Sequence, residues 1–499
     1  MKICQTVMTP TLAGLRADRD AASAAARQGC VSLVELRLDG LSPAELDVAG
    51  ALADRTLPVI VTCRPAWEGG AFTGSEEERL RILTEAARLG AEFVDIEMDA
   101  ETRTSGAITA VAGAGRERTR MIVSKHVAAP GVPRDLADTV RVMRACAEAA
   151  GPHSVTKIAI SAERPRDCAA LRRAVFGEGP VTGVIAIAMG AAGVLSRVLP
   201  AKFSTEWTYA GTAAPGQLSV DELVTQYRVS EVTAATRVFG IGGAPLSHSA
   251  SPAMHTAAFA AAGIDAVFVR VETADAGELL EIGEALDFEG FSITAPLKAK
   301  LVGRVHVHVD AASRAIGAIN TLRRRSGGGW DGRNFDAAAF HAALGADAEV
   351  LPGQRAIVIG AGGAARAAAS ELHAAGAIVE LAARDREKAQ ALADELGVAV
   401  GEWPPSGDAA LIVNATPVGT APRVEASPIA AGAVRAHVAY DLVYNPEDTT
   451  FLKDARARGA RTIGGLEMLV AQAGKQCEWW TGARVEPDVF RRAAQEFIR

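Results

Sequence analysis

The sequence predicts an α/β protein in two parts, a (β/α)8 barrel followed by a two-lobed unit that contains a Rossmann-type nucleotide-binding sheet. Over roughly the first 210 residues, short β-branched runs alternate with alanine- and charge-rich helical stretches, the repeat expected of a barrel. Further on, an apolar run at 356–359 leads into the glycine-rich segment 360–365, and a second apolar run follows at 378–382. This pattern is typical of one βαβ nucleotide-binding unit.

Bulk properties exclude several classes of protein. The chain has 499 residues, too many for one hydrophobic core, and its 49% hydrophobic and 22% charged residues are ordinary for a soluble globular protein. The net charge of −7 argues against a nucleic-acid or anionic-membrane partner. The six cysteines form no CxxC pair, so we expect neither a disulfide framework nor a metal site, and a cytoplasmic location fits best.

Two further segments bear on location. The first five residues lack the apolar core of a secretory signal. The uncharged stretch 179–196 contains several glycines, so it predicts a buried strand that runs into a glycine loop rather than a membrane span.

The barrel half contains eight candidate strands. They cover residues 3–7, 31–36, 59–62, 93–96, 121–123, 155–160, 184–188 and 203–209, with helices such as 76–89 and 136–150 between them. An open doubly wound sheet is the competing interpretation, but it would need fewer strands. Ser219 and Glu222 form a capping-box pattern that opens a helix to about residue 227.

The polar stretch 229–237 separates the barrel from a new strand at 238–241. Residues 238 to about 335 alternate strands and helices and end in a hairpin whose turn is 326–329. We therefore predict a barrel over 1–228, a first lobe over 236–338 with 473–499 packing back on it, and a Rossmann lobe over 339–472.

Polar residues at the ends of the barrel strands are the candidates for chemistry, because barrel enzymes carry their catalytic groups there. Lys157 is flanked by apolar strand residues, and desolvation with nearby arginines would lower its pKa and give an amine able to attack a carbonyl. An edge-strand lysine that discourages aggregation is the plainer alternative. Together with His126 and three arginines, Lys157 suggests a carbonyl substrate that bears a carboxylate, an imine, and a proton-transfer residue.

Residues 1 to about 228 resemble type I 3-dehydroquinate dehydratase. The motifs that carry the resemblance are Glu35-Leu-Arg-Leu-Asp39, Arg64 with Trp67-Glu-Gly-Gly70, Asp95-Ile-Glu97, Ser124-Lys-His126, Val155-Thr-Lys157-Ile, Gly193-Val-Leu-Ser-Arg197 and Ala214-Pro-Gly-Gln217. The resemblance implies that Lys157 forms an imine with the C3 ketone of dehydroquinate and that His126 removes a C2 proton and assists loss of the C1 hydroxyl. It implies that Glu68 orients His126 and that Arg197 and Gln217 hold the substrate. It also implies that Arg37, Arg64 and Glu35 complete the pocket. Ala213 departs from the serine usual in the closing loop.

In the second half, Gly360-Ala-Gly-Gly-Ala-Ala365 after a strand offers backbone N–H groups to a pyrophosphate. Arg384 follows the second strand, where an arginine suits the 2′-phosphate of NADP. Asp385 comes next and leaves NAD possible.

The second half resembles shikimate dehydrogenase over about 260 residues. The motifs are Pro245-Leu-Ser-His-Ser249-Ala-Ser251-Pro252, Ser292-Ile-Thr294-Ala-Pro-Leu-Lys298, Gly317-Ala-Ile-Asn320-Thr321, Asn334-Phe335-Asp336, Gly360–Ala365, Asn414-Ala-Thr-Pro417, Tyr444 and Glu467-Met-Leu-Val-Ala-Gln472. The resemblance implies that Lys298 and Asp336 are the proton-transfer pair. It implies that substrate is bound by Ser249, Ser251, Thr294, Asn320, Tyr444 and Gln472. It implies that the cofactor is bound by Gly360, Ala361, Gly362, Gly363, Ala364, Ala365, Arg384, Asn414, Thr416 and Gly465.

Three departures from this second family stand in the sequence: Phe335 for threonine, Thr420 for methionine, and Ala383-Arg384-Asp385 for Asn-Arg-Thr. The expected function is dehydration of dehydroquinate followed by NADPH reduction to shikimate. A quinate-active dehydrogenase and a metabolite-sensing pseudoenzyme are the alternatives.

Overall fold

The computed structural model describes the chain except for residues 27–28, 100–105, 116–117, 178–180 and 499. The chain divides into two compact units, Met1–Thr236 with Gly277–Asp287, and Arg237–Ala276 with Phe288–Arg499. Of the uncharged stretch 179–196, residues 179 and 180 lie outside the described residues, and the rest contains strand β7 (Val184–Met189). Within the described part of the chain, no helix is long and apolar enough to cross a membrane.

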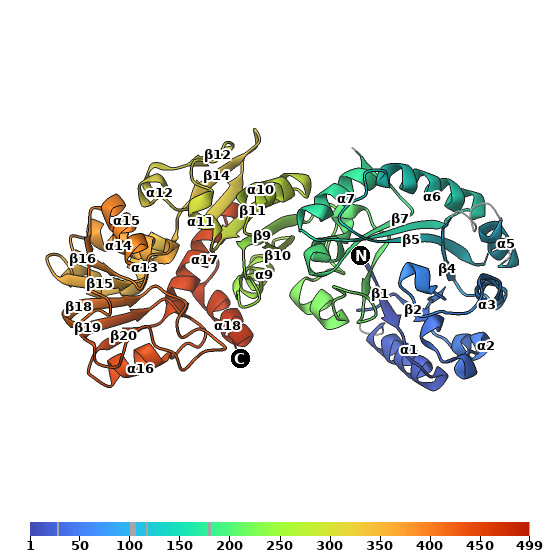
Figure 1. The fold of residues 1–499 in the computed structure, drawn as a ribbon, viewed down its shortest axis with the longest axis horizontal. Helices are drawn as coiled ribbons and strands as arrows, with labels where there is room; N and C mark the ends of the chain where they lie inside the picture. Colours follow the sequence, from blue (N-terminus) through green and yellow to red (C-terminus); the bar gives the residue numbers. More distant parts are fainter. Residues whose placement is uncertain (27–28, 100–105, 116–117, 178–180, 499) are drawn as a thin grey trace. The chain divides into compact units, whose positions relative to one another are not determined.

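The first unit is built on eight parallel strands in the order β7-β6-β5-β4-β3-β2-β1-β8. A bridge from Val184 to Thr205, just before β8, joins the two ends of this sheet, so the predicted barrel is confirmed. The strands are β1 (Lys2–Val7), β2 (Leu33–Arg37), β3 (Val59–Thr62), β4 (Phe93–Glu97), β5 (Arg120–Pro130), β6 (Val155–Ser161), β7 (Val184–Met189) and β8 (Trp207–Ala210). The helices are α1 (Leu12–Ala26), α2 (Val48–Leu52), α3 (Glu76–Arg88), α5 (Ala107–Ala114), α6 (Leu136–Ala150), α7 (Arg166–Phe176) and α8 (Val194–Val198), and they surround the strands (Figure 1).

Two strand predictions need correction. β5 does not end at residue 123 but continues through His126, which pairs with Ala159 of β6. The polar residues 124–126 end the apolar run that marks a buried strand, and residues 128–130 are exposed. The predicted strand 203–209 is too long at its start, because Pro200–Phe203 form a 3₁₀ helix and Ser204 has a left-handed φ of 45°.

The capping box is confirmed. The Oγ of Ser219 accepts from the Glu222 N–H at 3.1 Å, and the Glu222 Oε2 accepts from the Ser219 N–H at 2.8 Å. The helix that follows is a single π-helical stretch, Glu222–Gln226.

The second unit contains two six-stranded sheets. The first has the order β10-β9-β11-β13-β14-β12, and β13 and β14 form the predicted hairpin around 326–329. Its strands are β9 (Arg237–Gly243), β10 (Ala266–Glu272), β11 (Phe288–Ile293), β12 (Val307–Val309), β13 (Thr321–Arg324) and β14 (Trp330–Arg333). The helices in this part of the sequence are α9 (Ser251–Ala261), α10 (Ala276–Ala285), α11 (Leu297–Lys300) and α12 (Ala311–Ile316). We call this sheet and its helices α9, α11 and α12 the substrate lobe.

The second sheet is parallel, in the order β17-β16-β15-β18-β19-β20. This is the doubly wound order of a Rossmann fold, so the predicted nucleotide-binding unit is confirmed. The strands are β15 (Arg355–Ile359), β16 (Ile378–Ala382), β17 (Ala399–Val400), β18 (Gly407–Asn414), β19 (Val434–Asp441) and β20 (Arg461–Ile463). The helices are α13 (Asp336–Leu344), α14 (Gly363–Ala374), α15 (Arg386–Leu396) and α16 (Thr450–Arg456), followed by α17 (Gly465–Thr481) and α18 (Pro487–Ile498).

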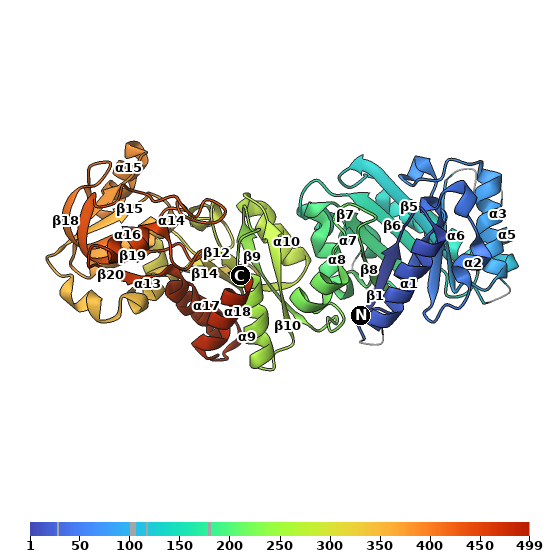
Figure 2. The same cartoon turned by 90° about the horizontal axis from the view of Figure 1, so that it is seen from below.

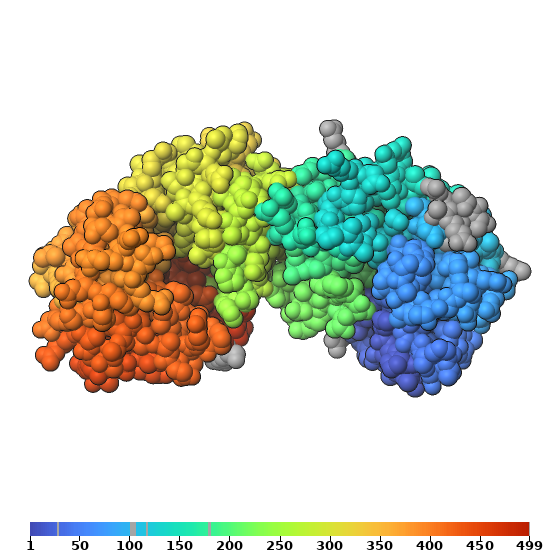
Figure 3. Space-filling view, in the orientation of Figure 1, coloured from blue at the N-terminus to red at the C-terminus, as the bar shows by residue number. Residues whose placement is uncertain are grey.

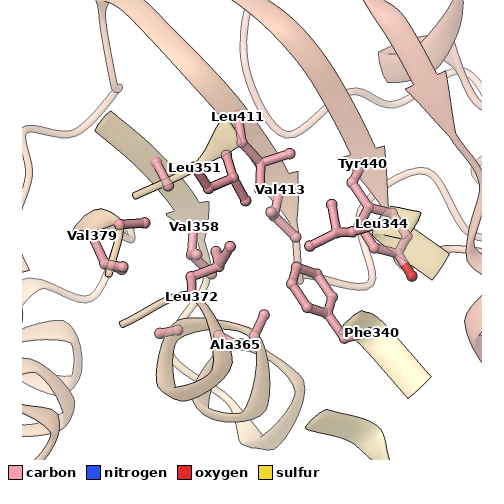
Figure 4. Packing of buried hydrophobic residues seen from close by; sticks show 14 of the residues in the cluster. Phe340, Leu344, Leu351, Val358, Ala365, Leu372, Val379, Leu411, Val413 and Tyr440 are labelled. Atoms are coloured by element: carbon pink, nitrogen blue, oxygen red, sulfur yellow. The ribbon is translucent and has the colours of Figure 1, made fainter. Parts of the chain in front are cut away.

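The core of the Rossmann lobe lies between this sheet and helices α13 and α14. Val358 and Val413 of the sheet pack with Leu372 of α14 and Phe340 of α13 (Figure 4). Small residues such as Ala365 on α14 let the helix backbone approach the sheet closely, which holds the N-terminus of α14 at the end of β15.

Helix α17 packs against both lobes of the second unit (Figures 1 and 2). Its Met468 belongs to the Rossmann core, whereas its Leu469 and Trp480 belong to the core of the substrate lobe with Phe239. In the space-filling view, red residues of this C-terminal segment show between the yellow and green substrate lobe and the orange Rossmann lobe (Figure 3). One helix thus ties the two lobes together.

Candidate active sites

Lys157 lies inside the barrel on β6, with only 3% of its surface exposed. Its Nζ lies 2.8 Å from Oδ2 of Asp95 and 3.4 Å from Oε1 of Glu35. The Nζ also stands 4.5 Å from the ring centre of Tyr209. The groups in direct contact with this amine are thus two carboxylates, whereas the sequence-based expectation named nearby arginines. Asp95 is placed to take a proton from the ammonium.

Glu35 is held as a carboxylate next to this lysine. Burial by itself would raise its pKa, but the positive charges of Lys157, Arg64 and Arg37 outweigh burial and lower the pKa to about 2. The hydroxyls of Thr6 and Thr62 each donate to Glu35 at 2.9 Å.

His126 lies between a carboxylate and a guanidinium. Its Nδ1 lies 2.8 Å from Oε2 of Glu68, and its Nε2 lies 2.7 Å from Nη1 of Arg64. Because a guanidinium only donates, Nε2 must accept and Nδ1 must carry the proton. Burial, followed by Arg64 and other nearby cations, lowers the pKa of His126 well below its usual value, so the imidazole is neutral. The unprotonated nitrogen, Nε2, is therefore the one that faces Arg64.

Glu68 lies on the short 3₁₀ turn after β3. Besides the imidazole, its Oε2 accepts from the backbone N–H of His126 at 2.5 Å. Burial raises the pKa of Glu68 to about 7. This carboxyl group therefore titrates in the neutral range and fixes both the position and the tautomer of His126.

Arg64 is the centre of an ion-pair network. It contacts Asp95 at 3.3 Å and Glu97 at 3.2 Å, and the fully buried Arg79 contacts the other oxygen of Glu97 at 2.5 Å. Nearby, Arg37 forms two parallel hydrogen bonds with Asp39, at 2.8 and 2.7 Å. The arginines are thus held in place by carboxylates before any ligand binds.

A pocket of about 340 Å³ opens above these groups. It is lined by Arg37, Arg64, Glu68, Gly69, His126, Ala128, Ser161, Ala162, Met189, Gly190, Ala213, Ala214 and Pro215. Arg197 and Gln217 support the loop that covers it. Arg197 Nη2 donates to the carbonyl of Pro215 at 3.4 Å, and Gln217 accepts from the Ala214 N–H at 3.0 Å and donates to Thr6 at 3.3 Å. Burial lowers the pKa of Arg197 to about 10.

The structure thus places Lys157, His126, Glu68, Glu35, Arg37 and Arg64 around one site. Sequence reasoning assigned no role to Asp95, although that residue makes the shorter contact with Lys157. The signal was available, because Asp95 and Glu97 end a barrel strand just as Glu35 and Arg37 do.

In the second unit, Lys298 and Asp336 are in direct contact. Nζ of Lys298 lies 2.5 Å from Oδ2 of Asp336, and Nδ2 of Asn320 donates to Oδ1 of the same carboxylate at 2.7 Å. Asn320 also donates to Oε1 of Gln472 at 3.1 Å. The pair lies beside the glycine-rich segment, since a Cβ added to Gly363 would stand 3.2 Å from Cδ of Lys298.

The other expected substrate residues lie on loops of this unit. The Ser251 N–H donates to Oγ of Ser249 at 3.3 Å at the start of α9, and the hydroxyl of Tyr444 donates to the carbonyl of His248 at 3.1 Å. Thr294 follows β11, and its carbonyl accepts from the Leu297 N–H at 2.9 Å in the turn before Lys298. In the described part of the chain, no hydrogen bond joins the side chains of these four residues to the Lys298–Asp336 pair. The ring of Phe335 packs edge-on against Trp479, with the ring centroids 5.7 Å apart.

A larger pocket of about 820 Å³ lies at the carboxyl end of the Rossmann sheet. It is lined by Ile359, Gly360, Ala361, Gly362, Ala383, Arg384, Asp385, Lys388, Trp403, Ala415, Thr416, Pro417, Val418, Ser427 and Pro428. A Cβ on Gly362, at the N-terminus of α14, would meet nothing within 4 Å, so a ligand can approach the backbone there. Gly360 has a φ of +123°, which only glycine adopts easily.

Five expected cofactor residues line this pocket: Gly360, Ala361, Gly362, Arg384 and Thr416. The other five, Gly363, Ala364, Ala365, Asn414 and Gly465, are not among the residues that line it. Asn414 instead accepts from the N–H and the hydroxyl of Thr416 at 3.1 and 2.7 Å and so positions that residue. Gly465 is required by packing, because a Cβ there would stand 2.5 Å from the carbonyl of Leu442.

Asp385 is engaged within its own helix. Its Oδ1 caps α15 by accepting from the Lys388 N–H at 3.1 Å, and its Oδ2 pairs with Nζ of Lys388 at 2.7 Å. Hydrogen bonds from Lys388 lower the pKa of this carboxyl. Lys388, which sequence reasoning missed, therefore brings a positive charge into the pocket beside Arg384.

Among the described residues, no group of three or more His, Cys, Asp or Glu side chains could hold a metal ion. A barrel with an interior lysine, joined to a lobe pair with a nucleotide pocket beside a Lys–Asp pair, defines a two-domain enzyme. The family model described as Type I 3-dehydroquinase matches residues 3–234. Models for the shikimate dehydrogenase substrate binding domain and the shikimate 5′-dehydrogenase C-terminal domain match residues 241–322 and 465–495.

Relatives agree with these matches. The chloroplastic bifunctional 3-dehydroquinate dehydratase/shikimate dehydrogenase of Arabidopsis thaliana is 33% identical over 492 residues, which cover 92% of this chain and 79% of the plant protein. A shikimate dehydrogenase (NADP(+)) of Halobacterium salinarum is 40% identical over 51% of this chain and 97% of its own. The crystal structure of shikimate 5-dehydrogenase from Thermus thermophilus, in complex with NADP(H) and shikimate, is 34% identical and covers 52% of this chain and 100% of its own, with a TM-score of 0.48. This chain belongs to the family of bifunctional 3-dehydroquinate dehydratases/shikimate dehydrogenases.

Proposed function

We propose that the chain catalyses two consecutive reactions, Schiff-base dehydration of 3-dehydroquinate to 3-dehydroshikimate and NADPH-dependent reduction of that product to shikimate. The observation that carries the proposal is the presence of both reactive groups in one chain, a buried lysine in the barrel and a Lys–Asp pair beside the glycine-rich loop. The plant relative, similar over 92% of this chain, carries both activities in its name. The names of the relatives favour shikimate over quinate as the acid that the second half produces.

In the barrel, the proposed cycle begins when Lys157 passes a proton to Asp95, 2.8 Å away, and the free amine attacks the C3 carbonyl carbon of dehydroquinate. Loss of the carbonyl oxygen as water gives an iminium ion. His126 then removes the C2 proton, and the electron pair of the broken C–H bond moves into the iminium to give an enamine. The enamine returns a pair that forms the C1=C2 double bond and restores the iminium as the C1 hydroxyl leaves, and the His126 imidazolium gives that hydroxyl the proton with which it departs as water. Hydrolysis of the imine returns the lysine.

The geometry of His126 supports its role as the base. The lone pair on Nε2 is the one available to take a proton, and the Nδ1 proton is held by Glu68 at 2.8 Å. A negative Glu68 stabilises the imidazolium that forms when the proton is taken. Since Arg64 occupies the lone pair at 2.7 Å, substrate must draw that guanidinium aside before His126 can act. Arg37, Arg64, Arg197, Glu35 and Gln217 are the proposed substrate-binding residues of this site.

In the second unit, Lys298 and Asp336 are proposed to deliver a proton to the carbonyl oxygen as it is reduced. The Asp336 carboxylate, which also accepts from the Asn320 amide, holds Nζ of Lys298 at 2.5 Å. Bound NADPH supplies the hydride. Ser249 and Ser251 are proposed to bind the substrate carboxylate, and Thr294, Asn320, Tyr444 and Gln472 the ring hydroxyls.

The residues around the nucleotide pocket fit NADP. The pocket of about 820 Å³ has the open backbone at Gly362 for a pyrophosphate and two cationic side chains, Arg384 and Lys388, for a 2′-phosphate. We propose as the cofactor-binding set Gly360, Ala361, Gly362, Gly363, Ala364, Ala365, Arg384, Asn414, Thr416 and Gly465. Five of these residues line the pocket, and the other five would support the lining from behind.

We further propose domain limits of 1–228 for the barrel, 236–338 with 473–499 for the substrate lobe, and 339–472 for the Rossmann lobe. A cytoplasmic enzyme that binds no nucleic acid and no membrane fits the net charge of −7 and the six cysteines without a CxxC pair.

One coupled assay tests the whole proposal. Purified protein is incubated with dehydroquinate and NADPH, and shikimate is measured by mass spectrometry while NADPH oxidation is followed at its absorbance band. We expect one shikimate per NADPH consumed. Dehydroquinate that remains unchanged would contradict the dehydratase activity assigned to the barrel. Dehydroshikimate that accumulates without NADPH oxidation would contradict the reductase activity assigned to the second unit.

A further inference from the structure

His255 is a fully buried imidazole in the substrate lobe, on the same helix as Ser251. Its ring stacks on Phe268 with centroids 4.6 Å apart, and Trp480 stands 5.1 Å away. Burial lowers the pKa of His255 to about 3, so the ring is neutral at any pH at which the protein functions. A neutral imidazole has one N–H donor and one acceptor.

The partner of His255 decides which nitrogen carries the proton. Its Nε2 lies 3.3 Å from Oε1 of Gln476 on α17. The amide Nε2 of Gln476 donates to other groups: to Oγ1 of Thr321 at 2.9 Å, and to the carbonyl of Asn320 and Oγ of Ser292, each at 3.2 Å. Gln476 Oε1 must therefore accept, and His255 must donate from Nε2.

The hydrogen bonds beyond Gln476 continue in the same direction. The hydroxyl of Thr321 donates to Oδ1 of Asn320 at 2.8 Å, and Nδ2 of Asn320 donates to Asp336 at 2.7 Å. Asp336 then receives Lys298 at 2.5 Å on its other oxygen. Four side chains thus donate in one ordered series, from the buried His255 through Gln476, Thr321 and Asn320 to the Asp336 carboxylate.

We propose that His255 and Gln476 are positioning residues for the reduction, which fix the orientation of the Asn320 amide and through it the Lys298–Asp336 pair. The proposal rests on the reduction assigned above to that pair. If Asn320 were flipped, its carbonyl oxygen would face the carboxylate and repel it. The Phe335 N–H donates to Oδ1 of Asn320 at 2.9 Å and opposes that flip, and Gln476 adds to this by orienting the Thr321 hydroxyl and by holding the main chain of Asn320.

A purely structural role predicts a different result and can be separated by a matched control. Trp480 on the same helix also donates a buried hydrogen bond to β13, from Nε1 to the carbonyl of Leu322 at 2.9 Å. This bond ends on main chain outside the series. Trp480→Phe therefore removes a comparable buried bond, and some packing against His255, without breaking the path to Asp336.

The test compares Gln476→Met, His255→Leu, His255→Gln and Trp480→Phe in the full-length protein. We expect Gln476→Met to lower kcat for dehydroshikimate reduction about tenfold or more, the effect of one lost buried hydrogen bond to a charged network. KM for dehydroshikimate should change much less than kcat, because the lost contact acts on the proton-transfer pair. NADP affinity, measured by calorimetry, and dehydratase activity should stay as in wild type.

His255→Leu should show the same pattern more weakly, and His255→Gln, which keeps a donor near the position of Nε2, should restore most of the rate. Trp480→Phe should lower the melting temperature with kcat nearly unchanged. If Gln476→Met behaves like Trp480→Phe at an equal loss of melting temperature, the positioning role is wrong while the reduction stands. A wild-type protein that fails to reduce dehydroshikimate overturns the proposed function itself and the positioning role with it.

Discussion

Nη1 of Arg64 lies 2.7 Å from Nε2 of His126, so a guanidinium occupies the lone pair that the proposed base needs. The imidazole is fixed from the other side by Glu68, whose pKa is raised to about 7 by burial. His126 itself has a pKa well below its usual value, so its own titration does not limit activity near neutral pH. Glu68 is therefore the group that should set the acid limb of the dehydratase.

The first prediction concerns this acid limb. Below pH 7 Glu68 becomes neutral and ceases to stabilise the imidazolium, so kcat/KM should fall as the pH drops through about 7 and level off above it. Glu68→Gln should lower kcat/KM about 10- to 100-fold, the value of a charge-assisted hydrogen bond, and remove that limb. Measuring kcat/KM from pH 5.5 to 9 checks this.

Burial also raises the pKa of Glu97 to about 7, so this second carboxyl must be separated from Glu68. If Glu68 causes the acid limb, the pH profile of Glu97→Gln should retain that limb. An acid limb that persists unchanged in Glu68→Gln would show that another group causes it. Glu77→Gln, at an exposed position on α3, is the neutral control.

The second prediction concerns imine formation at Lys157. Borohydride added with dehydroquinate or its product should leave a stable mass on the peptide that contains Lys157. Lys157→Arg should form no adduct and should not dehydrate, yet it keeps a positive charge between Asp95 and Glu35. Lys157→Met removes the ammonium between two buried carboxylates and leaves Asp95 only its longer contact with Arg64, so it should also lose up to about 3–5 kcal/mol of stability. A label on another lysine, or dehydration by Lys157→Arg, would remove the imine mechanism.

The two folds could be predicted because their signals are local. The β-branched runs recur along the barrel half, and the glycine-rich segment Gly360–Ala365 is contiguous, so both can be recognised in the sequence itself. The contact between Lys157 and Asp95 depends on residues 62 positions apart across three neighbouring strands, which no local pattern reveals. His255 and Gln476 are 221 positions apart, and each by itself looks like an ordinary core residue.

A nearer feature was also missed. Lys388 lies only three positions after Asp385, the spacing at which a cap and an ion pair form at the start of a helix. The sequence therefore contained the reason why Asp385 does not face the cofactor as a free charge. What it lacked was the helix boundary at Arg386, because boundaries are the least certain part of such predictions.

The third prediction separates the two activities. Lys298→Ala or Asp336→Asn should each cost about 2–3 kcal/mol of transition-state stabilisation in the reduction, the usual scale for a positioned acid–base group. Dehydratase activity should hardly change, because these side chains belong to the second unit. Steady-state assays of both reactions on the same preparations check this. Parallel loss of both activities in a folded variant would contradict independent sites.

The fourth prediction concerns the choice between NADP and NAD. Arg384 and Lys388 both line the nucleotide pocket, while the carboxylate of Asp385 is used by the cap of α15 and by Nζ of Lys388 at 2.7 Å. Repulsion of a 2′-phosphate by Asp385 is therefore reduced. We expect wild type to prefer NADP, and Arg384→Ala to lose most of a preference of about ten- to a hundredfold.

Substitutions at Asp385 and Lys388 test how these two residues affect the preference for NADP over NAD. Asp385→Thr should widen the preference for NADP with little loss of stability, since threonine can also cap a helix. Lys388→Ala should narrow it, because it removes a cation and leaves the Asp385 carboxylate without its partner. Arg386→Ala removes an equal charge from an exposed position beside the pair and serves as the control. The measurement is the ratio of kcat/KM for NADP to that for NAD in each variant. A wild-type preference for NAD would contradict the assignment of NADP. An equal effect of Arg386→Ala and Arg384→Ala would show that general charge, rather than a fixed contact at Arg384, governs the choice of cofactor.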